Sequence, residues 1–72
     1  MTNEEKLQLL EEILELPEGE LREDILLDDL EEWDSMARLS LIVLMEDEFG
    51  KKITRSEVMN YKTIQDILQT MN

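Results

Sequence analysis

The sequence contains no cysteine and no histidine. Without cysteine the chain forms neither a disulfide framework nor a thiolate metal site. Without histidine it lacks the commonest general base and the commonest transition-metal ligand, so a serine–histidine–aspartate triad is excluded. No other catalytic apparatus is evident in the remaining residues. We therefore expect a non-enzymatic protein without a metal site.

Basic residues are also scarce, since 7 lysines and arginines stand against 19 acidic residues and the net charge is −12. Such a chain should repel nucleic acid and anionic membranes and attract proteins that carry basic patches. The 42% of hydrophobic residues, recurring at helical spacing, favours a folded chain over a disordered one. There is no signal-peptide pattern, and the longest apolar run, Leu41 to Met45, is too short to span a bilayer. We expect a cytoplasmic monomer.

Helix signals recur along the 72 residues, a length that fits one domain, predicted to span 1–72. Thr2, Thr54 and Thr63 are each followed three residues later by an acidic residue, the capping-box pattern of a helix start. Gly50 is typical of a helix end. The expected helices run from about Thr2 to Leu16, from Asp34 or Ser35 to Phe49, from about Ser56 to Asn60, and from Thr63 onwards. The predicted fold class is all-α, with three main helices, one short helix and a long loop between helices 1 and 2.

The first expected helix is amphipathic. Leucines define its apolar face, and glutamates, Glu11 among them, are expected on the solvent side. Pro17 disfavours helical geometry at Leu16 and should end the helix there. The loop 17–34 is too apolar for a free linker, so we expect it to be ordered, with a helical turn and leucines tucked under the domain. Its apolar residues include Ile25, Leu26, Leu27 and Leu30. Its acidic residues lack the ligand spacing of an EF-hand.

The second expected helix has apolar residues of its own on several sides, so it is predicted to lie at the centre of the fold. We expect its core stripe to comprise Met36, Leu39, Ile42, Val43 and Phe49. Leu41, Leu44 and Met45 extend the apolar surface beyond this stripe.

Ser35, at the start of this helix, has two interpretations. A serine in this position usually caps the helix through its hydroxyl, although the Asp34 side chain before it can cap the helix as well. Alternatively, its hydroxyl is a point of covalent attachment, because a helix start favours a phosphate group and the preceding polar loop leaves the residue accessible. The position alone favours the cap.

The segment around Ser35 resembles the acyl carrier protein family. Asp34-Ser35-Met36 is similar to the family's Asp-Ser-Leu signature, and the run from Glu46 to Phe49 resembles the acidic close of its second helix. The resemblance implies that a transferase dependent on Mg²⁺ joins 4′-phosphopantetheine from coenzyme A to Ser35. Asp34 and Met36 would flank this attachment site, with Asp34 helping the transferase. The terminal thiol of the arm would carry acyl groups as thioesters.

The resemblance also implies that the second helix docks acyl-loading and acyl-transfer enzymes with basic patches. The matching docking residues are Arg38, Leu39, Val43, Glu46 and Asp47. The positions matching the family's acyl-chain cleft, each of which is also a plain core candidate, are Val43, Ile53, Val58, Tyr61 and Leu68.

The chain departs from the fatty-acid-synthesis type next to the serine, where Ala37, Arg38 and Ser40 replace acidic residues. This favours a specialised rather than a housekeeping carrier, in fatty-acid, polyketide or related acyl-transfer pathways. Two alternatives stay open: a stand-alone aminoacyl or D-alanyl carrier, and an unmodified acidic interaction module.

Overall fold

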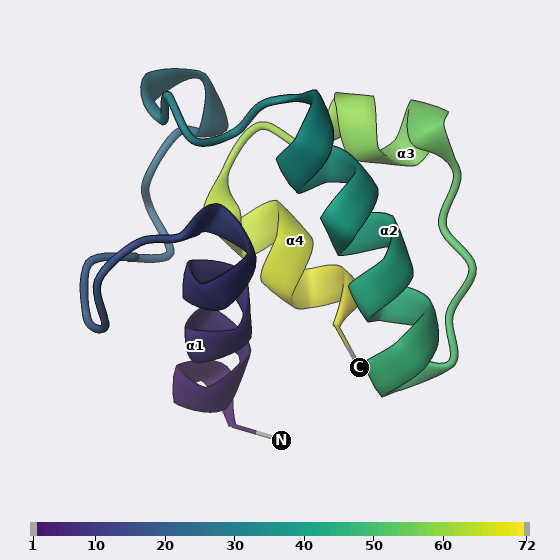
Figure 1. Ribbon diagram of the computed structural model, residues 1–72, viewed down its shortest axis with the longest axis horizontal. Helices are drawn as coiled ribbons and strands as arrows, with labels where there is room; N and C mark the ends of the chain where they lie inside the picture. Colours follow the sequence, from purple (N-terminus) through teal and green to yellow (C-terminus); the bar gives the residue numbers. More distant parts are fainter. Residues whose placement is uncertain (1, 72) are drawn as a thin grey trace.

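The computed structural model describes residues 2–71, over which the chain forms four α-helices and no β-strand (Figure 1). The helices are α1 (Asn3–Leu14), α2 (Ser35–Phe49), α3 (Arg55–Asn60) and α4 (Ile64–Thr70), with a single 3₁₀ turn, η1, at Leu27–Asp29. The predicted all-α class, with a short third helix and a long first loop, is confirmed. Residues 1 and 72 of the expected domain lie outside the described part.

The packing places α2 at the centre. α1 packs against α2 and α4, and α3 packs against α2 (Figure 1). The core draws on every helix, on the first loop and on the segments flanking α3 and α4. Its buried members are Leu10, Leu14, Leu21, Leu27, Ala37, Leu41, Met45, Ile53, Val58, Ile64, Ile67, Leu68 and Met71. None of the helices formed by residues 2–71 has the length and apolar character needed to cross a bilayer.

The helix starts follow the predicted capping signals. The Thr2 hydroxyl accepts the Glu5 N–H at 3.2 Å while the Glu5 carboxylate accepts the Thr2 N–H at 3.2 Å. Thr63 and Asp66 repeat this reciprocal arrangement at α4. At α3, the Thr54 hydroxyl accepts a backbone N–H three residues on. Side chains thus satisfy donors that a helix start leaves free.

The end of α1 comes earlier than predicted. The helix stops at Leu14, and Glu15 adopts the left-handed conformation with φ of 57°. The Leu16 N–H then donates to the Glu11 carbonyl at 2.9 Å. Pro17 disfavours helical geometry at Leu16, and the chain leaves the helix at Glu15, one residue before Leu16.

The first loop is ordered, as predicted, and it covers the end of α1. Leu21 and Leu27 are buried, and Ile25 and Leu30 are half-buried. Leu26, which was expected to tuck inward, is exposed instead. The Leu27 N–H donates to the Lys62 carbonyl at 2.8 Å, which fixes the loop against the connection between α3 and α4.

Glu11 does not lie on the solvent side, so its predicted position was wrong. Its side chain is only 4% exposed, and its carboxylate accepts the Leu21 N–H at 2.9 Å. The returning loop covers this side of α1 and supplies a backbone donor there. A glutamate is therefore stable in a position that the helical pattern alone assigns to water.

The buried side of α2 also differs from the predicted stripe. Ala37, Leu41 and Met45 follow one another at intervals of four and face the core. Three members of the predicted stripe are exposed instead: Met36 by 70%, Leu39 by 57% and Val43 by 52%. Apolar residues occur on several sides of this helix, so their spacing did not select a face. Contacts with α1 and α3 decide which side is buried.

Candidate functional site

The start of α2 is capped by Asp34 rather than by Ser35. Asp34 has an extended backbone, and its carboxylate accepts the Ala37 N–H at 2.9 Å. Ser35 is the first residue of the helix and is exposed. The interpretation of Ser35 as a helix cap is therefore wrong, and its hydroxyl is left accessible at the surface.

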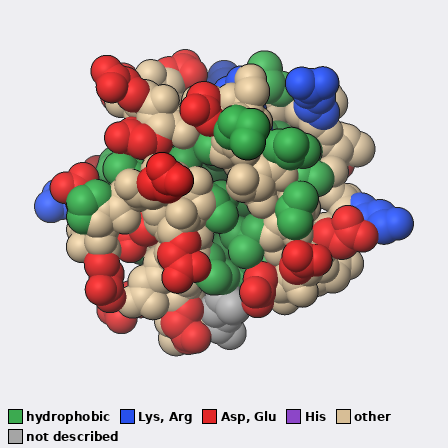
Figure 2. Space-filling view, in the orientation of Figure 1, with side chains coloured by type: hydrophobic (Ala, Val, Ile, Leu, Met, Phe, Trp, Pro, Cys, Tyr) green, Lys and Arg blue, Asp and Glu red, His purple; other side chains and the backbone are tan. Residues whose placement is uncertain are grey.

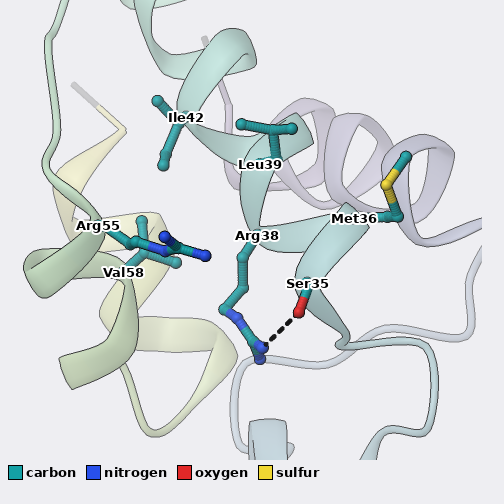
Figure 3. A pocket seen from close by; sticks show the side chains of 7 residues that line it. All are labelled: Ser35, Met36, Arg38, Leu39, Ile42, Arg55 and Val58. Atoms are coloured by element: carbon teal, nitrogen blue, oxygen red, sulfur yellow. Dashed lines mark hydrogen bonds between the residues drawn. The ribbon is translucent and has the colours of Figure 1, made fainter.

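A pocket of about 330 Å³ opens beside this hydroxyl, between α2 and α3 (Figure 3). Ser35 and Arg38 lie at one end of it, and the Arg38 guanidinium donates to the Ser35 hydroxyl at 3.3 Å. Arg55, from α3, extends its guanidinium towards α2 in Figure 3. The remaining lining is apolar: Met36, Leu39, Ile42 and Val58. The site thus combines a reachable oxygen nucleophile, two cations and an apolar surface.

A second hollow, of about 380 Å³, lies on the α1 side of Ser35. Its polar lining includes the carboxylate residues Glu15, Glu32 and Asp34. Met36 lines both hollows. Ser35 therefore stands between a basic side and an acidic side.

The predicted docking residues lie on accessible parts of α2. Leu39 and Val43 are exposed apolar side chains, Glu46 and Asp47 are exposed carboxylates at the far end of the helix, and Arg38 is half-buried. In Figure 2, acidic side chains lie over the first loop at the upper left, around α1 and near the lower end of α2, whereas apolar side chains gather over the upper part of α2. Ala37, one of the three residues that depart from the fatty-acid-synthesis type, is buried in the core.

The five predicted cleft residues differ in their exposure. Val58 lines the pocket beside Ser35. Ile53 and Leu68 are buried in the core, and Val43 is exposed on α2. Tyr61 is half-buried, and its hydroxyl oxygen is buried without a hydrogen-bond partner among the described residues.

Arg55 was missed as a site residue, although the sequence holds a signal for it. It follows the capping Thr54 and occupies the first position of α3. The helix dipole favours acidic residues there, so an arginine runs against the local preference. Such disagreements between local preference and sequence often mark functional positions.

The fold and the site together define a class: a small helical domain that presents an accessible serine hydroxyl at the start of its central helix. A family model described as a phosphopantetheine attachment site matches residues 7–71. The chain belongs to this family, the acyl carrier protein family, whose cofactor is covalently attached 4′-phosphopantetheine.

Three curated proteins named acyl carrier protein are similar to the chain. Those of Myxococcus xanthus and Micrococcus luteus are each 49% identical over 39 residues, 54% of this chain and 48% and 47% of their own lengths. That of Thermosynechococcus vestitus is 35% identical over 57 residues, 79% of this chain and 63% of its own length. The chain thus matches about half the length of the first two relatives. No solved structure matches it at a comparable significance.

The residues around Ser35 fit a phosphopantetheine group. Ser35 offers an exposed oxygen for the phosphodiester bond, and the Arg38 side chain lies within hydrogen-bond distance of that oxygen. The pocket beyond it has apolar walls that suit an extended organic arm. When bound, the group supplies a thiol that the chain itself lacks.

Proposed function

We propose that this chain is an acyl carrier protein that holds acyl groups as thioesters on a 4′-phosphopantetheine arm attached to Ser35. The proposal rests on the different roles of Asp34 and Ser35 at the start of α2. Asp34 caps the helix, so the Ser35 hydroxyl is free for chemistry and faces an open pocket. The chain acts as a carrier and not as a catalyst, and it needs a phosphopantetheinyl transferase for activation.

Two other serines in the chain provide internal controls. Ser40 is half-buried in the middle of α2, and Ser56 is exposed near the start of α3. Incubation with coenzyme A, Mg²⁺ and a phosphopantetheinyl transferase should add one arm to the wild type and to the Ser56→Ala variant, but none to Ser35→Ala. Intact-mass spectrometry measures the gain.

A thiol titration gives an independent readout. The chain has no cysteine, so the unmodified protein contains no thiol and the modified one should contain a single thiol. Acylation should then abolish the thiol signal. An unmodified interaction module, the alternative from another class, would gain neither mass nor thiol.

We further propose that partner enzymes with basic patches dock along the exposed side of α2. Leu39 and Val43 supply an apolar strip, and Glu46 and Asp47 supply negative charge at the end of it. Charge complementarity acts mainly on the association rate. Glu46→Gln with Asp47→Asn should slow association with such an enzyme and reduce its salt dependence. The same number of neutralised glutamates on α1, at Glu4 and Glu12, should change it little.

The part of this surface next to Ser35, formed by Met36 and Arg38, favours a specialised carrier over a housekeeping one. The half-buried Arg38 and the exposed Met36 stand beside the attachment residue, where a partner approaches. We place the chain in fatty-acid, polyketide or related acyl-transfer metabolism. Loading assays with acyl and aminoacyl donors would distinguish this role from that of an aminoacyl carrier.

A further inference from the structure

Ser35 lies between two hollows of opposite charge. On the α3 side are Arg38 and Arg55, and on the α1 side are Glu15, Glu32 and Asp34. In a chain with 19 acidic and 7 basic residues, two arginines at one pocket are a local reversal of sign. An anionic group linked to the Ser35 hydroxyl would be attracted to one side and repelled from the other.

The two arginines are available to bind such an anion. Among residues 2–71, neither forms an ion pair with a carboxylate, and the side-chain hydrogen bond made by Arg38 goes to the Ser35 hydroxyl itself. One backbone donor of the helix start, the Ala37 N–H, is already taken by the Asp34 carboxylate. Arginine side chains form strong charge-assisted hydrogen bonds with phosphate and would add to the backbone donors that the helix start still offers.

We propose that Arg38 and Arg55 bind the phosphodiester of the arm and thereby direct its apolar dimethyl portion into the pocket between α2 and α3, away from the acidic hollow. This inference rests on attachment of the arm at Ser35. Arg38 makes the nearer contact, since its guanidinium already reaches the linking oxygen. Arg55 faces the pocket from α3 and adds a second positive charge to its lining (Figure 3). Leu39, Ile42 and Val58 provide the apolar wall that the arm would contact.

The test is the position of the arm in the modified protein, measured by nuclear Overhauser contacts of its geminal methyl groups. Ile42 and Val58 report the basic pocket, whereas Ile13 and Ala37 report the acidic hollow. In the wild type we expect contacts with Ile42 and Val58. In the Arg38→Gln/Arg55→Gln double variant these contacts should be lost or move to the acidic side, and the ³¹P resonance of the arm should shift.

Matched variants separate charge from geometry. Arg22→Gln removes one positive charge from the exposed loop, on a residue that lines neither hollow, and should leave the contacts unchanged. Arg38→Lys keeps the charge but loses the planar fork, so it should weaken the contacts without abolishing them. If a transferase modifies the double variant poorly, Arg55→Gln alone should still weaken the contacts.

Intact mass is recorded before the spectra, so that two failures are told apart. If no arm is attached to the wild type, the proposed function is wrong and this inference falls with it. If the arm is attached but lies away from Ile42 and Val58, or if its contacts survive the double substitution, the carrier function stands and the role of the arginines is refuted.

Discussion

The buried contact between Glu11 and the first loop gives the most discriminating stability prediction. The Glu11 carboxylate is 4% exposed and accepts the Leu21 N–H at 2.9 Å, and Leu21 is itself buried in the core. Glu11→Ala removes the acceptor and leaves a buried backbone N–H without a partner. An unsatisfied buried donor costs about 1–3 kcal/mol, so we expect a loss of about 2 kcal/mol in the free energy of unfolding. For a domain of this size that lowers the melting temperature by about 8–16 °C.

Two companion variants isolate the hydrogen bond from the charge. Glu12→Ala removes the same charge from the exposed neighbouring position, and it should change stability by less than about 0.5 kcal/mol. Glu11→Gln removes the charge and keeps a carbonyl oxygen as acceptor, so it should retain most of the stability. Urea unfolding followed by circular dichroism measures all three. If Glu11→Ala and Glu12→Ala are equally stable, the contact with the loop does not stabilise the fold and the reasoning is refuted.

Three further predictions concern stability. Tyr61→Phe removes a buried hydroxyl that has no partner among the described residues, so the melting temperature should stay the same or rise, and a clear fall would reveal a missing contact. The Asp66 carboxylate accepts the backbone N–H groups of Lys62 and Thr63. These two hydrogen bonds, of which that from Lys62 has the larger effect, hold the pKa of Asp66 below the usual 3.8. That stabilisation is present above pH 3.8 and is lost as the pH falls through the lower folded-state pKa, so the stability difference between wild type and Asp66→Ala should shrink in acid. A difference that does not change with pH would contradict this. The net charge of −12 lies within a radius of gyration of 10.9 Å, so the acidic side chains repel one another in the folded state. Raising the salt from about 0.01 M to about 1 M shortens the Debye length from about 30 to about 3 Å. This screening should raise the melting temperature. A melting temperature independent of salt would argue against self-repulsion.

The helix starts could be predicted because their causes are local. Thr2, Asp34, Thr54 and Thr63 each accept a backbone N–H three residues further on, and such a pattern is visible in the sequence. Gly50 ends α2 with φ of 63°, a conformation that glycine adopts without strain. These signals place the elements but not the way they pack.

The features that the sequence did not predict depend on contacts between distant segments. The buried stripe through Leu41 is chosen by the packing of α1 and α3 around α2, since apolar residues lie on several sides of that helix. The burial of Glu11 depends on a loop that returns to α1 ten residues later.

In the candidate site, too, the sequence predicts neighbours along the chain but not contacts between distant segments. Ser35 and Asp34 could be predicted because they are neighbours in sequence. The approach of Arg55 to Arg38 requires α3 to pack across the start of α2, and no local pattern reports that. Packing likewise decides where the predicted cleft residues lie: Ile53, Val58 and Leu68 are all in the buried core cluster, and Val58 also lines the pocket.

The proposed carrier function depends on attachment of the arm at Ser35. Its most direct test is intact-mass measurement after incubation with coenzyme A, Mg²⁺ and a phosphopantetheinyl transferase. We expect one added phosphopantetheinyl group on the wild type and on Ser56→Ala, and none on Ser35→Ala. No added mass on the wild type, or an added mass that persists in Ser35→Ala, would contradict it.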